Sequence, residues 1–94
     1  MKIRRWAKFY VYIVECQDGT YYTGYTNDLA ERIKLHNKGY GAKYLRGKGP
    51  VNLVYAKEYH YYKNVLHAER KLKGLRRSQK DALIRAYEKN NNRI

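Results

Sequence analysis

The first part of the chain contains two short segments rich in aromatic and β-branched residues. Residues 9–16 (FYVYIVEC) and 21–25 (YYTGY) both consist largely of residue types that pack well on a pleated sheet. The segment QDGT lies between them, and its Asp18-Gly19 pair is typical of the tight turn that joins two antiparallel strands. The pattern therefore predicts a β-hairpin.

A helical pattern follows the hairpin. Residues 26–39 (TNDLAERIKLHNKG) begin with two cap-type residues, Asn27 and Asp28, and end at Gly39, which is a common helix stop. Residues 39–50 then contain four glycines, three basic residues and the only proline of the chain. This composition predicts a loop.

Apolar side chains alternate along residues 51–59 (VNLVYAKEY), which predicts a third strand. The alternating residues are Val51, Leu53 and Tyr55. From Asn64 onward the apolar residues return at helical spacing, which predicts a second helix. Its apolar stripe consists of Val65, Ala68, Leu72 and Leu75.

A last helix is predicted from Ser78, with that serine as the cap and Asp81 three residues further on in an imperfect capping box. Its apolar contacts are Leu83, Ile84 and Tyr87. Residues 90–94 (NNNRI) are expected to fray. The order β-β-α-β-α-α predicts an α+β fold, a small three-stranded antiparallel sheet flanked by helices. Ninety-four residues form one domain, with a core of about residues 9–88.

Charge narrows the class of partner. The chain has 21 Lys and Arg against 8 Asp and Glu, a formal charge of +13. A field of one sign attracts polyanions, and solubility alone does not require so much of it. Nucleic acid is the favoured partner, an acidic protein surface is the second choice, and an anionic membrane surface is the third.

The N-terminal segment combines a basic start with a short apolar run, which superficially matches a signal peptide. Glu15 interrupts that run and no small-residue cleavage site follows it. No stretch approaches the ~18 apolar residues of a membrane span. Cys16 is the only cysteine, so the chain has neither an intrachain disulfide nor a cysteine cluster for zinc. We expect a cytoplasmic protein.

Two polar residues occupy an unusual place on the first predicted helix. Arg32 and His36 lie on the same stripe as Leu29 and Ile33, where an ordinary amphipathic helix has apolar side chains. A structural explanation is that Arg32 extends its charged end into water and that His36 is a hydrogen-bonded residue at the edge of the core. A functional explanation is that both face a site.

Glu69 is the most informative of the eight acidic residues. It lies four residues after Val65 and three before Leu72, beside the face that packs on the sheet, where a carboxylate needs a partner. A salt bridge to Lys73, at position i+4, is the structural alternative to a functional role. Three histidines without close spacing make no zinc centre, and the glycine-rich loop lacks the spacing of a P-loop.

The residues around these positions resemble the GIY-YIG nuclease domain family. Its Gly-Ile-Tyr or Gly-Val-Tyr motif is matched by YVY at Tyr10–Tyr12, with a tyrosine in place of the leading glycine, and its Tyr-Ile-Gly motif by YTG at Tyr22–Gly24. Arg32, eight residues after that glycine, corresponds to the helical arginine of the family, and Glu69 corresponds to its later helical glutamate. The similarity covers about residues 9–84.

The resemblance implies metal-dependent hydrolysis of a phosphodiester. Glu69 would anchor one Mg²⁺ or Mn²⁺, and Arg32 would hold the scissile phosphate. Tyr22, or alternatively Tyr12, would orient or deprotonate the attacking water. His36 would be a further candidate for taking a proton or binding phosphate.

The resemblance also suggests where the substrate lies. Gly24 and Tyr25 would contact it beside the catalytic tyrosine. The loop residues Lys43, Arg46 and Lys48 would follow the nucleic-acid backbone, which gives salt-sensitive binding with little sequence readout. Twelve tyrosines against one phenylalanine suit base stacking on a basic surface, although tyrosine is also a good strand former.

Three functions follow from these observations. The main prediction is a DNA endonuclease that recognises the structure of its substrate rather than its sequence, with a protein partner for targeting. The first alternative is a DNA- or RNA-binding module that uses the same basic face without cutting. The second alternative is a protein-interaction domain, whose binding would be insensitive to salt and nucleic acid.

Overall fold

The computed structural model describes residues 8–91, and three strands and three α-helices lie within them. The elements are β1 (Phe9–Glu15), β2 (Tyr21–Thr26), α1 (Leu29–Asn37), the 3-10 helix η1 (Lys43–Leu45), β3 (Asn52–Tyr59), α2 (Tyr62–Lys73) and α3 (Arg77–Asn91). The order β-β-α-β-α-α and the α+β class are confirmed. The predicted loop at residues 39–50 contains the short helix η1, whose Leu45 is buried.

The three strands form one antiparallel sheet in the order β2-β1-β3, so that β1 is central and β2 is an edge strand. The predicted hairpin joins β1 to β2. Its turn is stabilised by the Asp18 carboxylate, which accepts a hydrogen bond from the backbone N–H of Thr20 at 3.0 Å. Gly19 has φ +86°, a left-handed conformation that glycine adopts without steric cost.

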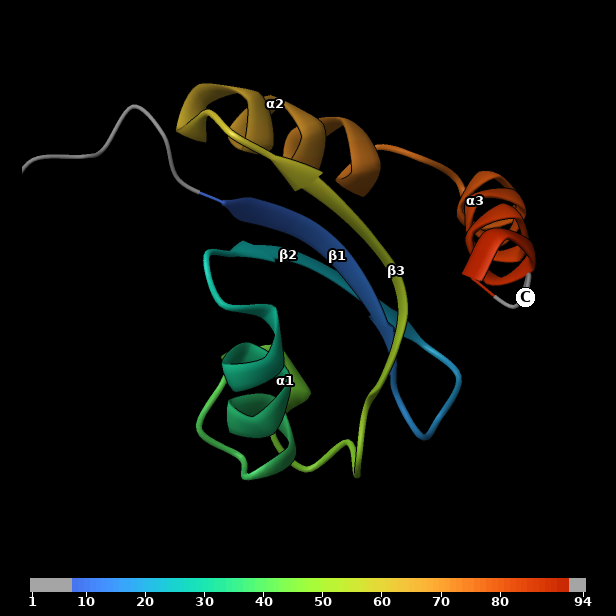
Figure 1. The fold of residues 1–94 in the computed structure, drawn as a ribbon. Helices are drawn as coiled ribbons and strands as arrows, with labels where there is room; N and C mark the ends of the chain where they lie inside the picture. The colour runs from blue at the N-terminus through green and yellow to red at the C-terminus, as the bar shows by residue number, and fades with distance from the viewer. Residues whose placement is uncertain (1–7, 92–94) are drawn as a thin grey trace, which may run out of the picture.

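Helices cover both faces of the sheet: α1 lies on one side, and α2 and α3 lie on the other (Figure 1). The side chains of β1 alternate between the two faces. Val11 and Ile13 pack with residues of α2 and α3, while Tyr12 and Val14 pack with residues of α1 and η1. A central strand buried on both faces explains why residues 9–14 contain no charged side chain and do not alternate between apolar and polar.

The third strand corrects one prediction. Val51, Leu53 and Tyr55 were expected to share a face. The register of β3 against β1 shifts by one residue between Ile13 and Val14 of β1, which lie opposite Tyr55 and Leu53. Leu53 therefore packs in the cluster on the α1 side, and Tyr55 packs in the cluster on the α2 side. A bulge of this kind reverses the alternation of side chains beyond it.

The first two helices begin close to the predicted positions. Asp28, not Asn27, caps α1, because its carboxylate accepts a hydrogen bond from the backbone N–H of Glu31 at 3.1 Å. The helix ends at Asn37, two residues before Gly39, which has φ +83°. The second helix begins at Tyr62 and not at Asn64, so that an exposed tyrosine becomes part of its first turn.

The predicted start of the last helix is wrong. Helix α3 begins at Arg77, which places Ser78 inside it, and the Gln79 side chain accepts the backbone N–H of Arg76 at 2.9 Å. Asp81 does not cap the helix. Its carboxylate accepts a 2.6 Å hydrogen bond from the hydroxyl of Tyr21 and so ties α3 to β2.

The end of the chain is more ordered than expected as far as it is described. Helix α3 includes the first two residues of the tail that was expected to fray, and the Asn91 side chain donates a hydrogen bond to the Tyr87 carbonyl at 2.8 Å. Residues 92–94 lie outside the described part. No helix within residues 8–91 has the length and apolar content needed to cross a bilayer.

Candidate active site

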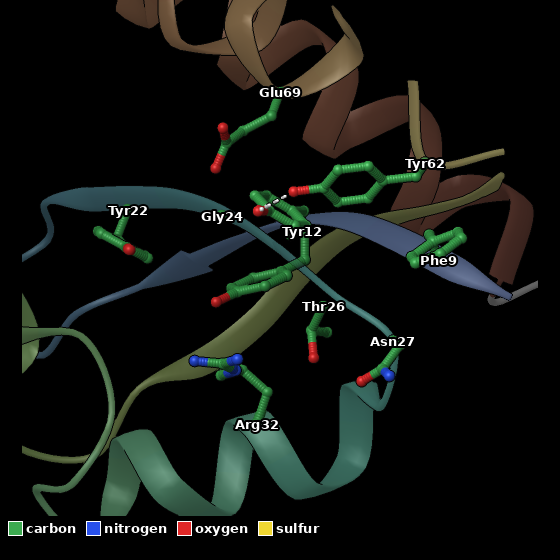
Figure 2. Close-up of a pocket in the computed structure, with 10 residues that line it drawn as sticks. Phe9, Tyr12, Tyr22, Gly24, Thr26, Asn27, Arg32, Tyr62 and Glu69 are labelled. Carbon is green, nitrogen blue, oxygen red and sulfur yellow. Dashed lines mark hydrogen bonds between the residues drawn. The ribbon is translucent and has the colours of Figure 1, made fainter. Parts of the chain in front are cut away.

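A pocket of about 430 Å³ lies beside the edge strand β2, between α1 and α2. Figure 2 shows Arg32 extending from α1 on one side of it and Glu69 extending from α2 on the other. The pocket is lined by Phe9, Tyr12, Tyr22, Gly24, Tyr25, Thr26, Asn27, Arg32, Tyr62 and Glu69. Six of the ten residues expected from the sequence therefore come together: Tyr12, Tyr22, Gly24, Tyr25, Arg32 and Glu69.

Gly24 leaves space for the side chain of Tyr12. The two residues are directly opposed in the β1–β2 register. A Cβ atom on Gly24 would lie 2.6 Å from the Tyr12 hydroxyl oxygen and 2.8 Å from its Cζ. The glycine of the YTG motif is therefore required by a neighbouring side chain, because only a residue without Cβ allows the Tyr12 ring to cross β2.

His36 lies behind Tyr12 rather than in the pocket. It is 3% exposed, and its Nε2 is 2.8 Å from the Tyr12 hydroxyl oxygen. Its Nδ1 accepts a hydrogen bond from the backbone N–H of Ala42 at 3.1 Å. Both ring nitrogens are therefore engaged within the protein, and neither is directed at a ligand in the pocket.

These contacts assign the tautomer of His36. Burial, with a smaller effect from the Arg32 charge, lowers the pKa of His36 below its ordinary value of 6.5, so the imidazole is neutral at neutral pH. Since Nδ1 accepts the Ala42 N–H, the proton resides on Nε2, which donates it to the Tyr12 oxygen. The Tyr12 hydroxyl keeps its own proton for a partner in the pocket.

Tyr12 is a weak acid in this environment. Burial raises the pKa of Tyr12 well above its ordinary value, and the neighbouring Tyr22 adds to the rise, while the Arg32 charge opposes it. A phenol of this kind accepts a proton only when a nearby cation stabilises its anion. Tyr22 lies closer to solvent than Tyr12, which makes it the more accessible phenol of the pocket.

Arg32 and Glu69 approach the pocket from opposite sides of the sheet. Arg32 shares its helical face with Leu29 and Ile33, which pack in the hydrophobic cluster between α1 and the sheet. The stripe predicted for the first helix is therefore confirmed. The predicted pair of Glu69 with Lys73 is also present, at 3.5 Å. That lysine is more than half exposed, so the pair is weak, and Glu69 lines the pocket as well.

An aromatic stack connects the pocket to the glycine-rich loop. The Tyr22 ring contacts His36 edge-on, with 5.8 Å between centroids, and stacks on Tyr44 of η1 at 5.9 Å. Lys48 lies over the Tyr44 ring at 4.2 Å from the centroid. The conformation of this loop therefore influences the position of Tyr22.

The three basic residues of the loop do not line the pocket. Arg46 and Lys48 border a separate hollow together with Asp18, to which Lys48 is paired at 3.4 Å. Lys43 is an exposed residue of η1. A role for these residues in binding is restricted to nucleic acid that extends beyond the pocket.

Sequence reasoning missed four residues of the pocket: Phe9, Thr26, Asn27 and Tyr62. Phe9 was predicted only as a residue of the first strand, and Tyr62 fell in the segment between the third strand and the second helix. The run HYYK at the start of α2 was the available signal, because adjacent tyrosines in a polar segment have no core to fill. Asn27 was taken as a helix cap, a role that Asp28 performs instead.

The donor chemistry suits a divalent cation with few protein ligands. Within residues 8–91 no group of three or more His, Cys, Asp or Glu side chains is arranged to hold a metal. Glu69 provides one carboxylate to the pocket, and its side chain is 18% exposed. Mg²⁺ is commonly bound through one or two carboxylates with water and substrate phosphates, so Glu69 fits such an ion.

Comparison with known proteins agrees with this arrangement. A model of the GIY-YIG catalytic domain matches residues 8–82. The chain belongs to the GIY-YIG family. Its fold is thus a nuclease fold, and the pocket is lined by Tyr12, Tyr22 and Gly24 from the two segments that resemble the GIY-YIG motifs.

Relatives of this GIY-YIG chain have a similar length. A UPF0213 protein of Halobacterium salinarum is 47% identical over 75 residues, which cover 80% of this chain and 97% of the relative. One from Clostridium perfringens is 51% identical over 75 residues, covering 80% of this chain and 81% of the relative. Neither name states an activity or a substrate.

Two solved structures share the fold. The NMR structure of the UPF0213 protein BH0048 from Bacillus halodurans has a TM-score of 0.56 and 44% identity, over 84% of each chain. An NMR structure of a protein from E. faecalis has a TM-score of 0.60 and 32% identity, over 94% of this chain and 92% of the other. Both matches cover more than four-fifths of this chain.

Proposed function

We propose that the protein is a metal-dependent endonuclease that hydrolyses DNA phosphodiester bonds and selects DNA by structure rather than by sequence. One observation carries the proposal: Tyr22, Arg32 and Glu69 converge on one pocket from three separate elements. A protein that only gripped DNA would have no need of this convergence. It would need only the basic surface.

Arg32 holds the scissile phosphate in this proposal. Its guanidinium presents a planar fork of N–H donors, which matches two phosphate oxygens at once. The pocket is open between α1 and α2, so a phosphate can enter between Arg32 and Glu69. Both side chains come from regular helices, which fixes their positions better than a loop would.

Tyr22 orients the attacking water. It gives its own phenolic proton to solvent, and as the phenolate beside the Arg32 charge it accepts the proton of that water. Tyr12 is the weaker candidate because burial raises its pKa. The hydrogen bond from His36 to the Tyr12 oxygen holds that ring in place over Gly24, and the ring in turn contacts Tyr22, with 6.5 Å between centroids. His36 and Gly24 thus position the two tyrosines.

Glu69 would hold one Mg²⁺ or Mn²⁺, with water and phosphate oxygens at the other positions. When bound, the ion would offset the negative charge of the phosphate and of the leaving oxygen. Lys43, Arg46 and Lys48 lie outside the pocket and would bind the backbone of flanking DNA, which makes binding dependent on salt. The chain acts as one catalytic domain in the cytoplasm, where a free buried thiol such as Cys16 stays reduced.

The test is a cleavage assay with labelled duplex, single-stranded, flap and four-way-junction DNA in Mg²⁺, Mn²⁺ or EDTA. Glu69→Gln and Arg32→Ala are expected to lose about a hundredfold or more in rate, since removing one group that stabilises transition-state charge typically costs that much. Glu31→Gln and Lys34→Ala remove the same charges from exposed positions of α1 and serve as controls. Both controls should cut at nearly the wild-type rate.

Other outcomes would reassign the function. Tight, salt-sensitive binding without cutting on any substrate would refute the nuclease and support a DNA- or RNA-binding module. Normal cutting by Tyr22→Phe would move the proton-accepting role to Tyr12. Normal metal binding and cutting by Glu69→Gln would show that the carboxylate is not the ligand.

A further inference from the structure

The pocket has an aromatic end that the proposed hydrolysis does not use. Phe9, Tyr25 and Tyr62 line this end, while Arg32 and Glu69 line the middle. Figure 2 shows Phe9 and Tyr62 to one side of the two charged residues, and Tyr22 on the opposite side. The pocket is therefore divided between a charged part and an aromatic part.

Tyr62 is the exposed member of this group, and its neighbours hold it in place. It is 37% exposed. Its ring lies 5.7 Å from the Phe9 ring and 5.9 Å from the Tyr25 ring, which meets it edge-on. Its hydroxyl is also 3.1 Å from that of Tyr25, an interaction drawn in Figure 2. An exposed ring that is already fixed loses little freedom when a ligand stacks on it.

Other exposed tyrosines lack this setting. Tyr44 is 49% exposed, but one neighbour, Tyr22, stacks on its ring and another, Lys48, lies over it. Tyr40 and Tyr61 are 75% and 46% exposed, and neither lines the pocket. Tyr62 is therefore the exposed tyrosine that lies next to the proposed phosphate site.

A nucleotide joins a flat base to a charged phosphate, and the two parts match the two ends of the pocket. The pocket volume of about 430 Å³ is in the range of small-molecule sites. A base within a duplex has both faces covered by its stacked neighbours and one edge covered by its partner. Away from the ends of a duplex, only a base that has left the stack can present its face to an aromatic side chain.

We propose that Tyr62, braced by Phe9 and Tyr25, stacks on an unpaired nucleobase next to the phosphate held by Arg32. This subsite rests on the proposed function, because the position of the phosphate follows from the role proposed for Arg32. It deepens that function by naming the substrate feature that the pocket selects, which is a nucleotide outside the double helix. The amide of Asn27 lines the same pocket and provides a donor and an acceptor for the edge of the base.

The test measures binding in EDTA, so that cutting does not interfere. Two hairpin duplexes with the same number of phosphates are compared, and each has one bulged nucleotide. In the first duplex the bulged base is 2-aminopurine, and in the second the bulged nucleotide is abasic. Wild-type protein should bind the bulged base roughly five- to a hundredfold more tightly, the factor expected for stacking of one base. The 2-aminopurine fluorescence should fall on binding.

Three variants identify the residue responsible. Tyr62→Leu should bind both duplexes equally, at the affinity of wild type for the abasic one. Tyr62→Phe keeps the ring and should retain the preference. Tyr40→Leu removes an exposed tyrosine elsewhere and should behave as wild type. Circular dichroism checks that each variant is folded.

Equal affinity of wild type for the two duplexes would overturn the subsite, and so would a preference that survives in folded Tyr62→Leu. Should that variant not fold, the NMR signals of the Tyr62 ring in wild type decide. These signals should shift when the duplex with the bulged base is added and should not shift with the abasic duplex. Equal shifts with the two duplexes would overturn the proposal.

The same duplexes with Mn²⁺ separate this proposal from the nuclease. Cutting without any preference for the base would refute the subsite and leave the nuclease intact. A base preference without cutting would refute the nuclease and leave a binding site for unpaired nucleotides.

Discussion

Replacement of Gly24 by alanine tests the packing on which the whole site depends. The added Cβ would lie 2.6 Å from the Tyr12 hydroxyl oxygen, 2.8 Å from its Cζ and 3.1 Å from Cε2 of Tyr22. Tyr12 is 2% exposed and its hydroxyl is held by His36, so its ring cannot move away from the new Cβ without disturbing that hydrogen bond. Overpacking of a core costs about 1–3 kcal/mol. Loss of the Tyr12–His36 hydrogen bond adds about 1 kcal/mol.

The expected loss in the free energy of unfolding is therefore about 2–4 kcal/mol. For a domain of this size each kcal/mol corresponds to about 4–8 °C in Tm, so the Tm should fall by roughly 10–30 °C. A domain of this length has a total stability of about 5–14 kcal/mol, so the variant should remain folded at room temperature. Its cutting rate should also fall, because Tyr12 contacts Tyr22 and His36.

The assay is thermal unfolding followed by far-UV circular dichroism, with Gly74→Ala as the control. Gly74 has a helical φ of −81°, and a Cβ there would meet its nearest atom, the Lys71 carbonyl oxygen, at an ordinary 3.5 Å. Its Tm should lie within a few degrees of wild type, since such a change typically alters stability by less than about 1 kcal/mol. A Tm for Gly24→Ala equal to that of Gly74→Ala would refute the argument that Tyr12 requires this glycine.

Three further predictions concern His36, its neighbour Gly41, and the contact between β2 and α3. A Cβ on Gly41 would overlap the imidazole of His36, so Gly41→Ala should lower the free energy of unfolding by about 1–3 kcal/mol. Urea titration measures this change, and an unchanged urea midpoint would contradict the prediction. Because burial lowers the pKa of His36 in the folded state, the unfolded chain takes up a proton first as the pH falls. Stability should therefore be full above about pH 7 and should decrease as the pH falls through 6.5, and His36→Gln should flatten the difference between urea midpoints at pH 7.5 and 5.5. Tyr21→Phe should cost about 1 kcal/mol through loss of its bond to the partly exposed Asp81, and a double-mutant cycle with Asp81→Ala should show that this cost disappears when the carboxylate is absent.

The identities of several site residues were accessible from the sequence because local spacing determines which side chains share a face. Arg32 follows Leu29 by three residues and precedes His36 by four, so a helix of any context places all three on one side. The opposition of Tyr12 and Gly24 likewise follows from a hairpin with a short turn. The prediction from alternating residues failed at Tyr55 because a bulge lies between Leu53 and Tyr55 in β3. A single sequence gives no clear signal of such a bulge.

The partners of these side chains could not be read from the sequence. Asp81 was assigned to a helix cap on local grounds, but Tyr21, sixty residues away, binds its carboxylate. His36 was a candidate proton acceptor until the fold placed Ala42 on one ring nitrogen and Tyr12 on the other. Contacts of this kind depend on how the helices pack on the sheet, which is a property of the whole chain.

The sequence by itself determined the order of the elements, the α+β class, the positive charge and the motifs that indicate the family. These depend on the period of apolar residues, on turn-forming residues and on composition, all of which are local. Only the tertiary structure decided that Glu69 from α2 faces Arg32 from α1 across the edge strand, and that Phe9 and Tyr62 complete the pocket. Distant segments meet there because both faces of one central strand must be buried, and burial of apolar surface acts over the whole chain without regard to sequence separation.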